Sequence, residues 1–148
     1  MVSQKCQYAI RAIFELARRY GRGPVKISDI AEAQAIPLRF LEVILSQLRR
    51  VGFVQSKRGA EGGYFLARHP DLVMVGEIIQ FMEGPQVPVA CMTDLAAAAC
   101  SLQGNCAFIG MYKRAAKALS DVYDRTSFQD LVDNDTKMRN AASLTYSI

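Results

Sequence analysis

Two helical patterns separated by a three-residue turn constrain the fold of this chain more than any other feature. The first pattern is short, and Ser28 stands where we expect its N-cap. The second runs from about Leu38 to Val51 with its apolar residues at helical spacing. Between them, Ala35–Pro37 places a proline at the start of the second helix, where its missing N–H costs nothing. Two helices around so tight a turn predict a helix-turn-helix unit.

The flanking segments extend this unit. A longer helix is predicted over Gln7–Tyr20, before two glycines interrupt it. After the second helix of the unit come two β-prone stretches, Phe53–Ser56 and Gly63–Leu66, joined by a glycine-rich segment that contains Lys57 and Arg58. A hairpin in this place is typical of the wing of a winged-helix domain. We therefore expect a mainly α fold with a small β-hairpin, in which a winged helix-turn-helix is followed by a long dimerisation helix.

Charge is divided unevenly along the chain. Residues 1–68 contain 12 Lys and Arg against 5 Asp and Glu, whereas residues 69–148 contain 6 against 9. A basic segment favours contact with a polyanion, because Lys and Arg that neutralise phosphates release condensed counterions. The alternative is a solvated basic face without a partner. Together with the helix-turn-helix pattern, the charge indicates binding to double-stranded DNA.

The second half of the chain has longer amphipathic patterns. One helix ends at Gly84-Pro85, and a longer one is predicted from about Ala107 to Arg125. Little chain remains to cover the apolar stripe of the longer helix, so we expect it to form the interface of a homodimer. The alternative is that this stripe packs back on the core of its own chain.

These patterns divide the chain into three predicted parts. Residues 1–70 form the winged helix-turn-helix domain, and residues 71–132 form the dimerisation helices together with a cysteine loop over 85–106. Ser127–Leu131 predicts a last short turn, and residues 133–148 are expected to be a flexible tail.

Three of the four cysteines, Cys91, Cys100 and Cys106, lie within 16 residues, without a CxxC pair. On a single helix, with about 100° per residue, their thiols would face different directions. They converge only if the segment is a loop. Soft sulfur donors select iron-sulfur clusters, zinc or copper(I), and structural zinc sites usually contain closely spaced pairs. We therefore expect an iron-sulfur cluster, the alternative being inert buried thiols that pack as small hydrophobes.

A fourth cluster ligand must come from outside this loop. Cys6 is the one remaining thiol, and Gln7 beside it offers an amide oxygen. Both are candidates, although Cys6 could equally be a packing residue on a helix. His69, the only imidazole, precedes Pro70 just after the wing, so we expect an exposed linker histidine there.

Several segments in a fixed order carry a family resemblance. They are Tyr8–Ala12, Ile27–Ala31, Ile36–Glu42, Gly59–Tyr64 and the three-cysteine loop. From about Gln4 to Leu131 the chain resembles the IscR, NsrR and RirA type of bacterial winged-helix regulators. The resemblance implies a homodimer whose long helices pair, with a [2Fe-2S] or [4Fe-4S] cluster held by the loop cysteines. It also implies that the cluster state sets which promoters are bound and so reports iron supply, nitric oxide, oxygen or redox stress.

The resemblance also implies which residues touch DNA. Arg39 and Glu42 match positions of the recognition helix that contact DNA in the family, and Arg58 matches a wing cation that enters the minor groove. Arginine can read a guanine edge through two hydrogen bonds, whereas wing contacts mainly position the protein. From charge and placement alone we add Arg49, Arg50 and Lys57.

Two ligand positions of the family are not matched. Some members take a fourth ligand from a carboxylate near the start of the first helix of the other subunit, where this chain has Gln7. Others use a histidine just after the third cysteine, where this chain has Ala107–Ile109. The cluster type and the fourth ligand therefore stay open, with Cys6, Gln7, a water or a small thiol as candidates.

The sequence thus predicts a DNA-binding regulator in which loss or oxidation of a cluster reshapes the loop Pro85–Cys106 and changes the angle between two DNA-binding heads. One alternative is a cluster-free regulator that uses the cysteines as a thiol or zinc sensor. Another is an iron-sulfur carrier or redox protein without DNA binding.

Other classes find no support in the sequence. There is no phosphate-cradling glycine loop and no plausible Ser-His pair or acid pair, so we expect no enzyme. No apolar run approaches the roughly 20 residues that cross a bilayer, and the first residues lack the apolar stretch of a signal peptide. We expect a cytoplasmic protein without a membrane partner.

Overall fold

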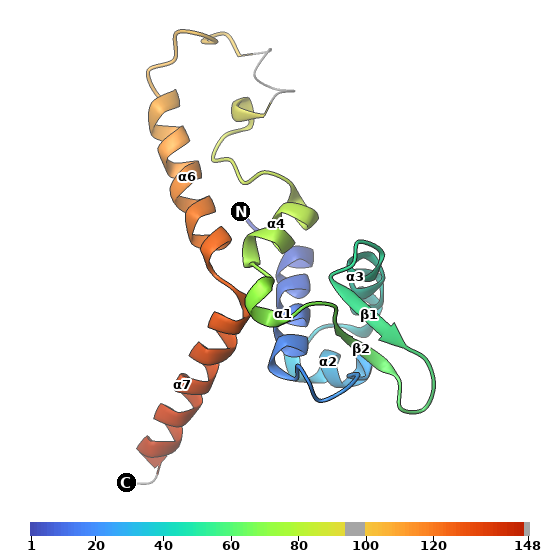
Figure 1. Ribbon diagram of the computed structural model, residues 1–148. Coiled ribbons are helices and arrows are strands. Elements are labelled where there is room, and N and C mark those ends of the chain that lie inside the picture. Colours follow the sequence, from blue (N-terminus) through green and yellow to red (C-terminus); the bar gives the residue numbers. More distant parts are fainter. Residues whose placement is uncertain (94–99, 147–148) are drawn as a thin grey trace.

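A computed structural model describes residues 1–93 and 100–146 (Figure 1). The N-terminal half is a compact head from which a two-stranded hairpin projects, and two long helices extend from the head in opposite directions. The helices are α1 (Gln4–Arg18), α2 (Ile27–Gln34), α3 (Leu38–Arg50), α4 (Val75–Glu83), α6 (Ile109–Arg125) and α7 (Phe128–Tyr146), with short 3-10 turns at Pro70–Leu72 and Ala90–Met92 and strands β1 (Val54–Lys57) and β2 (Gly63–Leu66). This confirms the predicted mainly α fold with a hairpin.

Helix α1 is the centre of the core. Its N-cap is Ser3, whose hydroxyl oxygen accepts a hydrogen bond from the backbone N–H of Cys6 at 3.2 Å. α2, α3, α4, α7 and β2 all contact α1. The face of α1 that they cover combines small and large apolar side chains, and the small ones allow neighbouring backbones to approach closely. The apolar residues of this buried face are Cys6, Ala9, Ala12, Ile13, Leu16 and Ala17.

The turn between α2 and α3 has a strained residue. Ala35 caps α2 with φ 49° and ψ 50°, the only non-glycine residue with positive φ among the described residues. The left-handed region costs about 1–2 kcal/mol for a residue with a Cβ atom. The predicted N-cap of α2 is wrong, because Ser28 lies inside the helix and Lys26 occupies the cap without a side-chain hydrogen bond.

The hairpin is confirmed, with its first strand one residue later than predicted. The N–H of Phe53 still bonds to the carbonyl of Leu48 at 3.0 Å, so Phe53 belongs to the turn that ends α3. β1 and β2 are antiparallel, and the far side of β2 is held by Val25, which exchanges two 2.8 Å backbone hydrogen bonds with Tyr64. Gly63 is required at this point because a Cβ atom there would collide with the backbone of Val25.

The junction between α6 and α7 is tied to the start of α4. The N–H of Val75 bonds to the carbonyl of Thr126 at 2.9 Å, and the N–H of Phe128 bonds to the carbonyl of Val73 at 3.0 Å. The ring of Phe128 is completely buried. These contacts fix the base of both long helices on the core.

The C-terminal segment differs from the prediction. A single helix of 19 residues continues to Tyr146, where the sequence led us to expect a short turn and then a flexible tail over 133–148, whose last two residues lie outside the described part of the chain. The helix begins with a reciprocal cap, in which the N–H of Ser127 bonds to Asp130 at 2.8 Å and the N–H of Asp130 bonds to the Ser127 hydroxyl at 3.0 Å. The side chains of α7 are polar on nearly all sides because most of this helix is exposed to solvent. That polarity had suggested a flexible tail.

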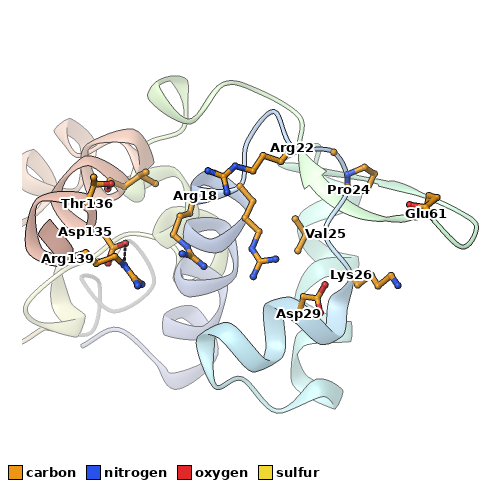
Figure 2. A pocket seen from close by; sticks show the side chains of 14 residues that line it. Arg18, Arg22, Pro24, Val25, Lys26, Asp29, Glu61, Asp135, Thr136 and Arg139 are labelled. Atoms are coloured by element: carbon orange, nitrogen blue, oxygen red, sulfur yellow. Dashed lines mark hydrogen bonds and ion pairs between the residues drawn. The ribbon is translucent and has the colours of Figure 1, made fainter. Parts of the chain in front are cut away.

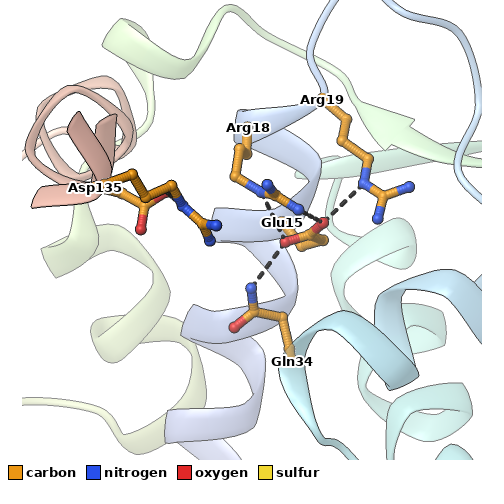
Figure 3. Close-up of polar contacts among 6 residues, drawn as sticks. Glu15, Arg18, Arg19, Gln34 and Asp135 are labelled. Carbon is orange, nitrogen blue, oxygen red and sulfur yellow. Dashed lines mark hydrogen bonds and ion pairs between the residues drawn. The ribbon is translucent and has the colours of Figure 1, made fainter. Parts of the chain in front are cut away.

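A buried carboxylate joins α1 to α2 (Figure 3). Glu15 is completely buried and accepts hydrogen bonds from Arg18 at 2.5 Å, Arg19 at 2.7 Å and the Gln34 amide at 2.8 Å. Burial by itself raises the pKa of Glu15, but the hydrogen bonds from Arg18, Gln34 and Arg19 together bring that pKa below its ordinary value. The carboxylate is therefore ionised in the folded protein at neutral pH.

Replacing Ala35 by glycine should stabilise the protein by about 0.5–1 kcal/mol, because relief of about 1–2 kcal/mol of strain exceeds the conformational entropy cost of glycine, about 0.5–1 kcal/mol. The matched control is Ala33→Gly, at an exposed position of α2. It should destabilise the protein by a similar amount. Urea denaturation measures both, and a loss of stability in both variants would contradict the strain at Ala35.

Glu15→Gln should destabilise the protein by about 1–3 kcal/mol at pH 7, because Arg18 and Arg19 lose their shared carboxylate. A carboxyl group with a lowered pKa stabilises the fold at neutral pH, and this contribution disappears as the pH falls below about 4.3. The difference in unfolding free energy between wild type and variant should therefore shrink in acid. Glu32→Gln, on the exposed side of α2, is the control. An unchanged difference from pH 7 to pH 3 would contradict the ionised state of Glu15.

Candidate nucleic-acid interface and cysteine cavity

Helix α3 has two faces of opposite character. Its buried face consists of Leu41, Ile44, Leu45 and Leu48. All four of the predicted contact residues on this helix are exposed: Arg39, Glu42, Arg49 and Arg50. At about 100° per residue, Arg39 and Arg50 project from the side opposite the buried stripe, and Glu42 and Arg49 project to one flank of it. The core therefore leaves this polar face of α3 free for a partner.

The two arginines at the end of α3 face different neighbours. Arg49 donates a hydrogen bond to the hydroxyl of Ser56 on β1 at 3.1 Å, which links the recognition helix to the wing. Arg50 lines a small hollow of about 250 Å³ together with Lys5 and Phe81, beside α1 and α4. Arg39 and Glu42 at the beginning of α3 are therefore the better placed pair for base contacts.

The wing places its two cations beyond the core. Lys57 ends β1 opposite Gly63, and Arg58 follows it in the connecting loop. Both side chains are exposed, and neither forms an ion pair with any residue of the described ranges. Gly62 lies so close to the carbonyl of Lys57 that a Cβ atom would not fit there. The tip is thus narrow, and its cations point into solvent.

Apolar residues at the start of α3 were missed at the sequence level. Leu38, Phe40 and Val43 are 46%, 45% and 53% exposed. Apolar side chains in the major groove can contact thymine methyl groups. Their exposure could have been predicted from the sequence, because the apolar stripe of α3 at helical spacing does not include these three positions.

A basic groove, also unforeseen, lies between the end of α1, the loop before α2, the wing and α7 (Figure 2). Its volume is about 610 Å³. Arg18, Arg22 and Lys26 line it from one side and Arg139, paired with Asp135 at 2.8 Å, from the other. Its cations come from distant segments, so only the folded chain brings them together.

The structure brings the three loop cysteines to one cavity of about 420 Å³. Cys91, Cys100 and Cys106 are each half-buried, and Lys113 on α6 lines the same cavity. Residues 94–99 of the predicted cysteine loop lie outside the described part of the chain. Within residues 1–93 and 100–146, no three His, Cys, Asp or Glu side chains are grouped closely enough to hold one metal ion. The thiols therefore share a cavity without forming a ready cage.

The candidate fourth ligands lie elsewhere. Cys6 is completely buried in the core, where burial and then the charge of Glu83 raise the pKa of its thiol to about 11. This is the environment of a packing residue. The exposed Gln7 donates a hydrogen bond from its amide to the carbonyl of Val2 at 3.1 Å. Neither residue lines the cysteine cavity of its own chain.

His69 is an exposed linker residue, as predicted. Its Nδ1 lies 2.6 Å from the Asp71 carboxylate, and its ring meets Tyr20 edge-on at 5.1 Å. These contacts occupy the imidazole at the start of a 3-10 turn, and His69 does not line the cysteine cavity.

Helix α6 leaves an apolar face uncovered. Met111, Leu119 and Val122 are 49%, 40% and 62% exposed, whereas Tyr123 packs against the core. Gly76 on α4 allows the close approach of α6, because a Cβ atom there would collide with Asp124. The side of α6 away from α4 is therefore without a partner among the described residues. None of the described helices has the combination of length and apolarity that a membrane span requires.

Comparison with known proteins identifies the relatives of this chain. The family model Rrf2, described as an iron-dependent transcriptional regulator, matches residues 2–134. The regulator CymR of Bacillus subtilis is 35% identical over 130 residues, which is 88% of both proteins. The regulator IscR of Erwinia tasmaniensis is 30% identical over 133 residues, covering 90% of this chain and 79% of that protein.

Solved structures agree with these relatives. The structure of CymR, the global cysteine regulator of B. subtilis, superposes with a TM-score of 0.74 at 34% identity, over 90% of this chain and 97% of that one. IscR of T. potens superposes with a TM-score of 0.71 at 32% identity, over 91% and 88%. The resemblance inferred from sequence and the winged-helix fold are both confirmed. The chain belongs to the Rrf2 family, and it is a transcriptional regulator and not an enzyme.

Proposed function

We propose that this regulator binds double-stranded DNA as a homodimer through α3 and the wing, and that the state of the cysteine cavity controls that binding. The observation that carries the proposal is the exposed face of α3, which places Arg39 on the side opposite its buried stripe and Glu42 one turn along beside it. The wing cations Lys57 and Arg58 extend from the hairpin that Arg49 joins to the same helix. A helix that can enter a major groove and a basic wing beside it are the two parts of winged-helix recognition.

The two parts have different tasks. Arg39 in the first turn of α3 can read a guanine edge through two hydrogen bonds, and Glu42 can accept one from the amino group of cytosine. Lys57 and Arg58 supply charge to the backbone or minor groove, which positions the protein on any sequence. Specificity therefore depends on α3, and most of the salt dependence on the wing.

The uncovered face of α6 supports the homodimer. Met111, Leu119 and Val122 recur at helical spacing and remain exposed in a single chain. Pairing of two such helices would remove this apolar surface from water, at about 25 cal/mol per Å². Two DNA-binding heads held by one pair of helices match the two half-sites of a palindromic operator.

The donor set of the cysteine cavity fits an iron-sulfur cluster. Cys91, Cys100 and Cys106 are soft ligands, and the cavity is otherwise lined by mostly apolar residues such as Met92 and Ile109. Because the thiols do not form a ready cage, binding requires the segment to close around the group and a fourth ligand to be supplied. A bound cluster would provide a centre that responds to iron, oxygen or nitric oxide.

A thiol sensor without a cluster is the second candidate. It is favoured by the absence of a grouped metal site among the described residues and by the similarity to CymR, described as a global cysteine regulator. Half-buried thiols around one cavity can also be oxidised, because such cysteines remain accessible to small reagents.

A change at the cysteine cavity, whether loss of a cluster or oxidation of the thiols, can be transmitted along packed helices. Ile109 and Lys113 in the first turns of α6 line the cysteine cavity. α6 contacts α4, α4 contacts α1, and α1 contacts α3. A change of the cavity that moves the beginning of α6 would therefore change how the two reading heads are held relative to each other. Coupling of about 1–3 kcal/mol would alter DNA affinity roughly 5- to 150-fold.

Lys57→Ala should weaken binding to all duplexes and reduce the slope of log affinity against log salt by about 1, because one phosphate contact is lost. The slope is obtained by measuring DNA affinity over a range of salt concentrations. Two duplexes are used: one that the wild type selects from a random pool, and one of unrelated sequence. Lys137→Ala on α7 is the control and should leave it unchanged. A slope that responds to Lys137 and not to Lys57 would place the interface elsewhere.

Replacing Cys91, Cys100 and Cys106 together by alanine should remove iron, acid-labile sulfide and visible absorption from protein purified without oxygen. DNA affinity should become that of the cluster-free wild type. The matched control is Cys6→Ala, which should keep the metal if Cys6 is the packing residue that its burial indicates. Iron retained by the triple variant would refute the cysteine cavity as the site. A wild type that lacks metal but loses DNA binding on thiol oxidation would select the second candidate.

A further inference from the structure

Four side chains form a ladder of cations and rings between α1 and the recognition helix. The guanidinium of Arg11 lies 5.5 Å from the centre of the Tyr8 ring, which is 6.2 Å from the ring of Phe40. The guanidinium of Arg39 lies over the other ring of the pair, 4.8 Å from the centre of Phe40. Both cation contacts are within the roughly 6 Å at which a ring face attracts a cation.

One end of this ladder is anchored in the turn of the helix-turn-helix. Arg11 is half-buried and donates hydrogen bonds to the carbonyls of Gln34 and Ala35, the latter at 3.5 Å. These carbonyls belong to the end of α2, where the helix dipole favours a positive charge. Tyr8 is half-buried against the core. The ladder is therefore fixed at α1 and at the turn.

The other end of the ladder, Arg39, is exposed and contacts only the ring of Phe40 within the ladder. Arg39 is exposed in the first turn of α3, and it forms no ion pair with any residue in 1–93 or 100–146. A free arginine side chain loses rotamer entropy when it is fixed on a base. The contact with Phe40 restricts the guanidinium of Arg39 before DNA arrives.

We propose that Phe40, supported by Tyr8, is a specificity-determining positioning residue that holds Arg39 ready to read one base pair. The inference rests on the proposed binding of DNA by α3. A purely structural role does not account for Phe40, because its side chain is 45% exposed while the adjacent Leu41 is fully buried and fills the core. The ring is placed where it can orient Arg39.

The test compares base preferences. Wild type and variants each select duplexes from a random pool, and sequencing gives the preference at every position. Arg39→Ala identifies the base pair read by Arg39, and should reduce the preference there by about 5- to 150-fold. Phe40→Leu keeps an apolar side chain without a ring face, and should reduce the same preference by about two- to fivefold, the worth of one exposed cation–ring contact.

Two further variants separate positioning from other roles. Phe40→Tyr retains the ring face and should restore the wild-type preference. In the Arg39→Ala background, Phe40→Leu should have no additional effect at that base pair, because the side chain it orients is gone. The salt dependence of binding should remain that of wild type in Phe40→Leu, since no phosphate contact is removed.

The outcomes that overturn the inference are distinct. An additive effect of Phe40→Leu at a different base pair would mean that Phe40 touches DNA itself. A uniform loss of binding with a lowered unfolding temperature would mean that Phe40 only supports the fold, and an unchanged preference would mean that Arg39 needs no support. A wild type that selects no sequence at all would instead refute the proposed function.

Discussion

The structure depends on the burial of one face of α1. Its large residues, Ile13 and Leu16, each contribute about 1.5–3 kcal/mol when removed from water, and the alanines between them let other elements approach closely. α2, α3, α4 and α7 all pack against α1. Glu15 adds a buried polar link, because its carboxylate joins the arginines of α1 to the last residue of α2. Among the described residues, the buried side chains of α3 belong to the same hydrophobic cluster as those of α1.

This arrangement separates two surfaces and connects them. α3 and the wing project from one part of the head, and the start of α6, which lines the cysteine cavity, lies beyond α4 (Figure 1). α1 and α4 lie between them, so under the proposed function a signal at the cysteines would reach the DNA-binding surface through these packed helices. α1 also carries Tyr8 and Arg11, which are linked to Arg39 through the ring of Phe40. One helix thus carries the main core face, holds the turn between α2 and α3 through Arg11, and supports the arginine that we propose reads a base.

Periodicity and turn residues were enough to predict α3 and the hairpin, because each has a strong local signal. α7 was missed because a helix that is polar on nearly all sides lacks the amphipathic pattern by which helices are recognised. The left-handed Ala35 and the cap at Lys26 depart from the usual preference for Gly and Ser at such positions; Arg11 binds the Ala35 carbonyl, and Val25 beside Lys26 is paired with Tyr64. The gathering of the three cysteines was predicted only on the condition that their segment is a loop. The ladder through Phe40 and the basic groove combine residues distant in sequence, which no local pattern reveals.

Amide hydrogen exchange of the wild type, with and without a selected duplex, tests most directly whether the α1 core presents α3 and the wing as one DNA-reading surface. We expect DNA to slow exchange in the first turns of α3 and around the tip of the wing. The buried amides of α1 should already exchange slowly in the free protein and change little. Slowing confined to α7 or to the neighbourhood of the cysteine cavity, with residues 38–66 unaffected, would contradict this account.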